Sequence, residues 1–191
     1  MAATPLLLAL DQGTSSSRAA LFDPRGVPVA SASAPLAISY PADGWVEQKP
    51  VEIWESQRLA MERLEQSISQ EQRDAVLTCG ITNQRETTIL WRRSDGQPCG
   101  PALVWQDGRT SEICQQWKED GFEQEWRART GLLLDPYFSA SKIRWLMRHE
   151  ASASSAAAHG DLCFGTVESW LLWHLSGQKR HCSDMSNASR T

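Results

Sequence analysis

The chain has 191 residues, of which 41% are hydrophobic and 22% are charged, a balance that indicates a folded globular protein and excludes wholesale disorder. The formal net charge of −4 argues against a basic surface for nucleic acid. No apolar run approaches the length of a membrane span, and the five scattered cysteines contain no C-x-x-C pair, which favours reduced thiols in a cytoplasmic protein.

The first part of the chain predicts three strands, a helix and a further strand. Residues 6–10 are an unbroken apolar run that ends before Gly13, and they predict a strand buried on both faces. Residues 18–22 and 27–33 continue an antiparallel meander, because Pro24 and Gly26 favour a tight turn between them. Pro50 suits the first turn of a helix. Helical spacing then covers about residues 51–69, and an apolar strand follows at 74–81.

The second part predicts short strands and helices. The expected strands are residues 87–91, 102–105 and 162–164, and the expected helices are about residues 110–118, 123–129, 139–149 and 166–175. We expect Ser139 and Thr166 to cap the last two helices. The Ala- and Ser-rich residues 151–160 predict a surface connection that is partly helical. Strands and helices in this order indicate an α/β protein.

A polar turn follows the first apolar run abruptly. It reads DQGTSSSR over residues 11–18 and carries a carboxylate, several hydroxyls and a cation. Hydroxyls and backbone amides can donate to phosphate oxygens, and a carboxylate can face Mg²⁺ or its waters. A Ser- and Thr-rich hairpin turn without a ligand explains the same residues, since the turn is neither a Walker loop nor a G-x-G-x-x-G motif. The local sequence leaves both explanations open.

Arg85 and Glu86 lie just beyond the strand predicted at residues 74–81, where ligands of open α/β sheets bind. Adjacent opposite charges are also explained by a surface ion pair of little energetic value. The alternative is a polyol, because a guanidinium supplies donors and a carboxylate accepts hydroxyl protons. Tyr137 would add a hydroxyl contact, and Trp105 could cover the carbon skeleton.

Several segments resemble the glycerol-phosphorylating members of the FGGY family of carbohydrate kinases. The main ones are DQGTSSSR (11–18), GITNQRET (80–87) and GLLLDPYFS (131–139), reinforced by GWVEQKP (44–50), FGTVESWL (164–171) and NASRT (187–191). The resemblance implies an α/β fold of the actin-like ATPase, ribonuclease H-like type with an N-terminal β-meander. It also implies transfer of the γ-phosphoryl group of ATP to glycerol, with Mg²⁺, to give sn-glycerol 3-phosphate.

The resemblance assigns roles residue by residue. The residues that match positions holding the ATP phosphates are Thr14, Ser15, Ser16 and Arg18. Asp11 matches the carboxylate near Mg²⁺. The residues that match glycerol contacts are Arg85, Glu86 and Tyr137, which would hydrogen-bond the substrate, and Trp105, which would pack on its carbons.

Family members are considerably longer, so the resemblance implies that residues 1–191 are the N-terminal domain portion of a kinase. The general-base Asp is then expected beyond Thr191, with no catalytic residue in this chain and negligible activity of the chain alone. The full-length protein is expected to be a cytoplasmic homo-oligomer that binds glycerol and ATP or ADP. Two alternatives remain: another FGGY polyol or sugar kinase, and a truncated, non-catalytic binding module.

Overall fold

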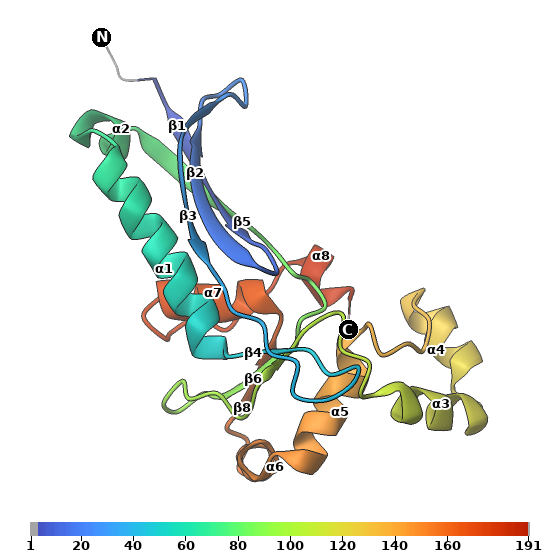
Figure 1. Cartoon of the computed structure of the whole chain (residues 1–191). Coiled ribbons are helices and arrows are strands. Elements are labelled where there is room, and N and C mark those ends of the chain that lie inside the picture. Colours follow the sequence, from blue (N-terminus) through green and yellow to red (C-terminus); the bar gives the residue numbers. More distant parts are fainter. Residues whose placement is uncertain (1–3, 191) are drawn as a thin grey trace. The chain divides into compact units, whose positions relative to one another are not determined.

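The computed structural model describes residues 4–190, so Thr191, the last residue of the NASRT segment, lies outside the described residues. The chain divides into two compact units (Figure 1). Unit 1 consists of Met1–Ile38 and Val51–Asn83, and unit 2 consists of Ser39–Pro50 and Gln84–Thr191. Residues 11–18 belong to unit 1, whereas Arg85, Glu86, Trp105 and Tyr137 belong to unit 2.

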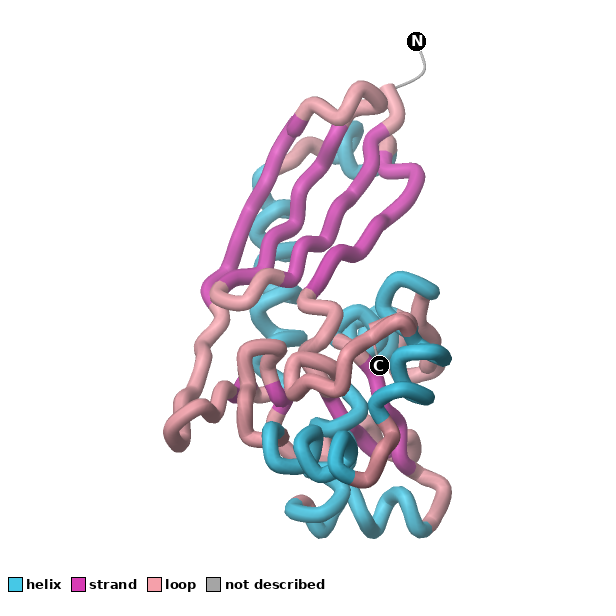
Figure 2. Tube along the Cα trace, turned by 90° about the vertical axis from the view of Figure 1, so that its right-hand side faces the viewer, coloured by secondary structure: helices cyan, strands magenta, loops and turns pink. Residues whose placement is uncertain are grey.

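Unit 1 is built on a sheet with the strand order β3-β2-β1-β5 (Figure 2). Its strands are β1 (Leu6–Gln12), β2 (Ser16–Phe22), β3 (Pro28–Pro35) and β5 (Val76–Asn83). The first three pair antiparallel, which confirms the predicted meander, and β5 pairs parallel to β1. The turn between β2 and β3 closes through a hydrogen bond from Gly26 N to Asp23 O at 2.9 Å. Gly26 has φ of +78°, a conformation that favours glycine.

Helix α1 (Pro50–Ser67) packs its apolar residues on one face of this sheet. Leu10 and Leu21 of the sheet share a core with Ala60 and Leu64 of the helix, and all four are at most 3% exposed. The predicted helix at 51–69 ends two residues early, because Ser69 caps a second short helix, α2 (Gln70–Asp74), by accepting a hydrogen bond from Gln72 N.

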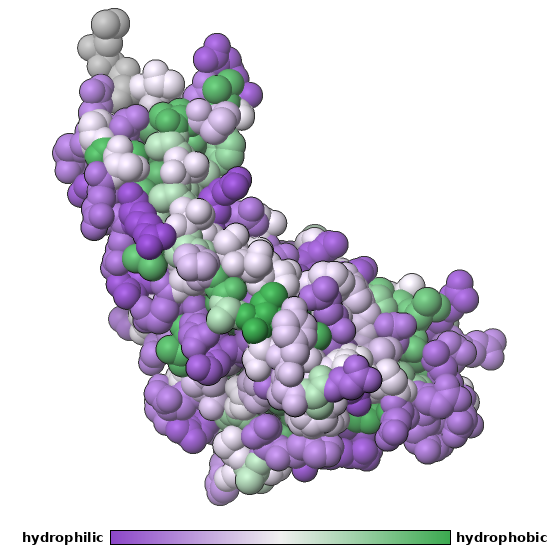
Figure 3. Space-filling view, in the orientation of Figure 1, coloured by the Kyte–Doolittle hydropathy of each residue, from purple (hydrophilic) through white to green (hydrophobic). Residues whose placement is uncertain are grey.

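The prediction that residues 6–10 are buried on both faces is wrong. Leu6 and Leu10 are buried, but Leu7 is 40% exposed, and Leu77 on the neighbouring β5 is 72% exposed. Side chains alternate between the faces of a strand, and within unit 1 helix α1 covers one face. Figure 3 shows apolar side chains at the surface in the region of these strands. The apolar run in the sequence therefore did not show which face of the strand is covered and which is exposed.

Unit 2 contains two small antiparallel sheets and six helices among its described residues. The strands are β4 (Glu47–Gln48) paired with β7 (Ala102–Leu103), and β6 (Ile89–Arg92) paired with β8 (Leu162–Gly165). The helices are α3 (Ser111–Glu119), α4 (Glu123–Thr130), α5 (Ser139–His149), α6 (Ala151–Ala158), α7 (Val167–Leu175) and α8 (Met185–Ala188). None of the helices within residues 4–190 has the length and apolar character needed to cross a membrane.

The predicted partly helical character of residues 151–160 is confirmed, but the segment does not lie wholly at the surface. It forms α6, whose Ala153 and Ala156 are buried in a core with Leu90 of β6 and Leu146 of α5. Small side chains allow this helix to lie close to its neighbours, and a composition-based argument does not detect that packing. The helix is a structural part of unit 2.

The two predicted caps of α5 and α7 also differ from the structure. Phe138, not Ser139, occupies the cap position of α5. Thr166 occupies the cap position of α7, but its hydroxyl contacts Glu168 Oε2 at 2.8 Å and Asn187 Oδ1 at 2.9 Å instead of a backbone amide. The Thr166 hydroxyl, which the local sequence predicted as a helix cap, therefore makes tertiary hydrogen bonds instead.

Candidate functional site

The β1–β2 turn, called here the phosphate hairpin (residues 11–18), presents polar side chains on a tight backbone. Gly13 N donates to Ser16 O at 3.0 Å and closes the turn. A Cβ at Gly13 would lie only 3.0 Å from that same oxygen, which explains the glycine. Ser15, Ser16 and Arg18 are exposed, and Thr14 is half-buried. The turn therefore offers hydroxyls and a cation to solvent.

Buried side chains hold this hairpin in place from within unit 1. Ser17 donates to Gln12 Oε1 at 2.9 Å and shares a hydrogen bond of 2.6 Å with Ser56 of α1. Gln57 Nε2 donates to Arg18 O at 3.1 Å, so α1 also fixes the backbone of Arg18. Leu36 N donates to Ser15 O at 2.9 Å. The hairpin is pre-organised without using its exposed hydroxyls.

Asp11 and Arg18 are directly opposite each other in the β1–β2 ladder, so their side chains emerge on the same face of the sheet. Both are exposed. A phosphate chain can be held by Arg18 and the hydroxyls, and Mg²⁺ typically uses one or two carboxylates together with phosphates and waters. Among residues 4–190 no three His, Cys, Asp or Glu side chains gather as a metal site. A single exposed carboxylate such as Asp11 is compatible with an ion held mainly by phosphates.

Unit 2 brings together the residues predicted to bind a polyol, called here the polyol cluster (Arg85, Glu86, Trp105 and Tyr137). The rings of Trp105 and Tyr137 meet edge to face, with centroids 5.9 Å apart. Glu86 is 5% exposed, and Arg85 is exposed and donates to Ser186 Oγ at 3.3 Å. Burial and the neighbouring Glu86 carboxylate raise the pKa of Tyr137, so its hydroxyl stays protonated and can donate.

Lys142 on α5 fixes the backbone beneath two of these residues, and sequence reasoning missed it. Its Nζ donates to Tyr137 O at 2.7 Å and to Glu86 O at 3.2 Å. Lys142 is 0% exposed, and this burial lowers its pKa to about 8. Ser139, Lys142 and Leu146 are all buried and recur at helical spacing. A lysine on the buried stripe of a helix was the signal that could have identified it.

Arg190 is a second residue that the sequence analysis gave no role. Its Nε donates to Glu86 Oε1 at 2.7 Å, and its guanidinium carbon lies 5.0 Å from the centre of the Phe138 ring. The exposed fractions of the two paired side chains are 26% for Arg190 and 6% for Glu86. The NASRT segment that contributed to the resemblance therefore contains a charge partner of the predicted substrate carboxylate.

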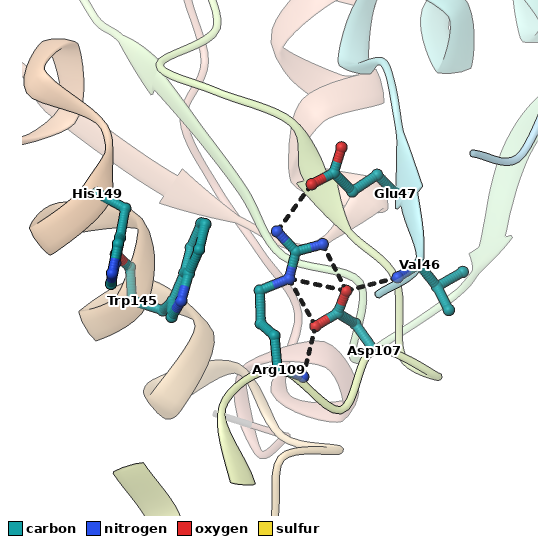
Figure 4. Close-up of polar contacts among 6 residues, drawn as sticks. All are labelled: Val46, Glu47, Asp107, Arg109, Trp145 and His149. Atoms are coloured by element: carbon teal, nitrogen blue, oxygen red, sulfur yellow. Dashed lines mark hydrogen bonds and ion pairs between the residues drawn. The ribbon is translucent and has the colours of Figure 1, made fainter. Parts of the chain in front are cut away.

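A buried ion pair lies immediately after Trp105 in the chain (Figure 4). Arg109 Nε and Nη2 donate to the Asp107 carboxylate at 2.7–2.9 Å, and the side chains are 1% and 0% exposed. Arg109 Nη1 also lies 2.7 Å from Glu47 Oε1 of β4. Asp107 Oδ2 accepts a hydrogen bond from Val46 N at 2.6 Å. These bonds tie residues 44–48 to the segment that carries Trp105.

Two tryptophans cover the Arg109 guanidinium. Its carbon lies 3.8 Å from the ring centre of Trp45 and 4.7 Å from that of Trp145. Trp145 in turn stacks on His149 with centroids 4.2 Å apart, as Figure 4 shows. Aromatic faces attract a weakly hydrated guanidinium, so the rings help offset the cost of burying this charge.

Comparison with known proteins identifies the family. The model for the N-terminal domain of the FGGY family of carbohydrate kinases matches residues 6–191. The chain belongs to the FGGY family of carbohydrate kinases. The mixed α/β fold with its N-terminal meander agrees with the actin-like architecture expected for such kinases.

Individual relatives place the chain within this family. It is 53% identical over 185 residues to a glycerol kinase of Acidovorax sp. (strain JS42), and the match covers 97% of this chain and 37% of the relative. The crystal structure of Plasmodium falciparum glycerol kinase with ADP superposes with a TM-score of 0.90 at 29% identity, covering 98% of this chain and 37% of that one. A gluconate kinase from Lactobacillus acidophilus shares the fold, with a TM-score of 0.84 at 22% identity over 98% of this chain and 36% of its own. The chain thus spans a little over a third of its relatives' length.

Proposed function

We propose that the protein containing this chain transfers the γ-phosphoryl group of ATP to glycerol and forms sn-glycerol 3-phosphate. The observation that carries this proposal is the polyol cluster, in which a carboxylate, a phenol and an indole lie together within unit 2. The guanidinium of Arg85 comes from the residue directly before Glu86. Each hydroxyl of a small polyol both donates and accepts, so Glu86 would accept while Arg85 and Tyr137 donate. Trp105 would pack against the carbon chain.

The phosphate hairpin supports the nucleotide side of the proposal. Thr14, Ser15, Ser16 and Arg18 would hold phosphate oxygens of ATP, and Asp11 would contribute to the Mg²⁺ site. Bound Mg²⁺ would neutralise charge on the transferring phosphoryl group. The similarity to a glycerol kinase solved with ADP supports a nucleotide as the second substrate. Phosphoryl transfer depends mainly on positioning and charge, which these residues are suited to provide.

We also propose that the general base is an Asp outside residues 1–191, as the resemblance to the longer family members implies. Glu86 is assigned instead to hydrogen-bonding the substrate, with Arg190 as its ion-pair partner. The 191-residue chain alone should therefore show negligible turnover. ATP- and glycerol-dependent ADP release by the purified chain would contradict this part of the proposal. A cytoplasmic location and a homo-oligomer for the whole protein remain predictions, the first favoured by the free cysteines.

The deciding experiment is a substrate panel on the native polypeptide that contains these residues. ADP release is measured with glycerol, a pentitol, xylulose and gluconate, and the phosphorylated product is identified by ³¹P NMR. We expect the highest kcat/KM for glycerol, with E86Q losing at least about a hundredfold in kcat/KM because a buried charge-assisted contact is removed.

E119Q is the matched control, since Glu119 is an exposed carboxylate of α3 outside the polyol cluster. It should leave kcat/KM unchanged. Preference for a sugar over glycerol would overturn the substrate assignment but not the family. Absence of turnover with every polyol and sugar would instead favour a non-catalytic binding module.

A further inference from the structure

The segment from Asp184 to Arg190 contacts both charged residues of the polyol cluster. Ser186 Oγ accepts a hydrogen bond from Arg85 at 3.3 Å, and Arg190 Nε donates to Glu86 Oε1 at 2.7 Å. Arg85 and Glu86 are adjacent in sequence but use different residues of this segment. The contacts join positions 101 and 104 residues apart in the chain.

The segment is held by buried polar groups rather than by apolar packing alone. Asp184 caps α8 by accepting from Ser186 N at 2.6 Å and Asn187 N at 3.0 Å. Asn187 is 4% exposed and accepts from Thr166 Oγ1 at 2.9 Å. Glu168 Oε1 accepts from Asp184 N at 3.2 Å. The backbone that leads to Arg190 is therefore fixed to the start of α7.

Arg190 itself is positioned by an aromatic ring and by its carboxylate. Phe138 lies beside the guanidinium, and the neighbouring Tyr137 is close enough to Glu86 and Arg190 for both to influence the pKa of its hydroxyl. The single bond from Nε holds one carboxylate oxygen of Glu86 beside a rigid, planar guanidinium. Arg190 thereby engages Oε1 of Glu86 and not Oε2.

We infer that Arg190 is a positioning residue of the polyol site: it holds the Glu86 carboxylate so that its second oxygen is aimed at a substrate hydroxyl. This inference rests on the proposed function, because it concerns the polyol that Glu86 binds. Arg190 supplies the counter-charge that lets Glu86 remain buried while it accepts from a neutral ligand. Its loss should weaken polyol binding specifically and leave nucleotide binding intact.

The test measures KM for the polyol and for ATP separately in the native polypeptide, using R190Q, R190K, E86Q and the double variant R190Q/E86Q. We expect R190Q to raise KM for glycerol about tenfold or more, since a hydrogen bond to a charged group is lost, while KM for ATP stays within about twofold. R190K should recover only part of the loss, because an ammonium lacks the planar fork.

The double variant separates positioning from general stabilisation. If Arg190 acts through Glu86, R190Q/E86Q should cost little more than E86Q alone, so the two effects are strongly non-additive. R180Q is the matched control, since Arg180 is an exposed arginine of the preceding loop, and it should change neither KM. Thermal unfolding of each variant shows whether a change in KM reflects loss of folded protein.

Two results would overturn the inference while leaving the proposed function standing. One is an R190Q enzyme that phosphorylates glycerol with wild-type KM, and the other is an additive loss in the double variant. If the wild-type enzyme prefers a different polyol, the same ratios are measured with that polyol. A wild-type protein that phosphorylates no polyol or sugar would overturn both the proposed function and this inference.

Discussion

The phosphate hairpin and the polyol cluster are built in opposite ways. The hairpin presents exposed side chains on a backbone that hydrogen bonds to itself and to α1. The polyol cluster depends on buried charges, with Lys142 beneath it, Arg190 beside it and the Arg109–Asp107 pair just after Trp105 in the chain. Substitutions in the hairpin should therefore change ligand binding with little cost in stability. Substitutions around the polyol cluster should change both.

The largest effect is expected for R109M. Removing the guanidinium leaves Asp107 buried without its charge partner, and breaking such a pair typically costs about 3–5 kcal/mol in the free energy of unfolding. Urea denaturation of the purified protein, followed by tryptophan fluorescence, measures this loss. R25M is the control, because the Asp23–Arg25 pair at the β2–β3 turn of unit 1 leaves the arginine 82% exposed, and we expect no measurable change. Equal losses in both variants would break the comparison.

Lys142 should give unit 2 a distinctive pH dependence. Its pKa is about 8 in the folded protein against an ordinary value of 10.5, so the unfolded chain binds more protons between these two pH values. The free energy of unfolding should therefore rise with pH across this window, by on the order of 3 kcal/mol from this group. K142M removes the contribution. The difference between the wild-type and K142M stability curves isolates Lys142 from the buried thiols, such as Cys114, whose pKa burial raises.

If the difference in the free energy of unfolding between wild type and K142M does not change from pH 7 to 10.5, the pKa of Lys142 is not lowered in the folded protein. K142M should also raise KM for glycerol, because the carbonyls of Glu86 and Tyr137 lose a shared donor. This second readout links the buried ammonium to the geometry of the polyol cluster.

R18Q tests the hairpin side of the comparison. We expect KM for ATP to rise about ten- to a hundredfold, since one charge-assisted contact to phosphate is lost. The urea midpoint should not move, because the Arg18 side chain is exposed and its backbone oxygen keeps the bond from Gln57. R25Q, which alters another exposed arginine of the same meander, should leave KM for ATP unchanged. A clear stability loss in R18Q would contradict a hairpin fixed by its backbone.

The smallest effect is expected for D11N. A carboxylate that assists a metal held mainly by phosphates contributes modestly, so the Mg²⁺ concentration for half-maximal activity should rise by about tenfold. Titration of activity with MgCl₂ at fixed ATP measures the change, and unfolding should be unaffected. No shift in the Mg²⁺ requirement would remove Asp11 from the metal site while leaving the phosphate contacts of Arg18 in place.

The sequence by itself determined the strand and turn at residues 6–18, the start of α1 at Pro50 and the candidate residues of both sites. These features follow from local signals: an apolar run, a glycine that a tight turn requires, and a proline that fits a first helical turn. The resemblance to the FGGY family also rests on short contiguous segments of the sequence.

Only the tertiary structure decided which residues support the polyol cluster and which faces are covered. Lys142 bonds a carbonyl 56 residues away, and Arg190 bonds a carboxylate 104 residues away. The spacing of residues along the chain does not predict such partners, because they depend on how distant segments pack. For the same reason Leu7 is exposed within an apolar run, and the Ala-rich α6 is partly buried. The cost of burying a charge is offset by partners that only the folded chain supplies.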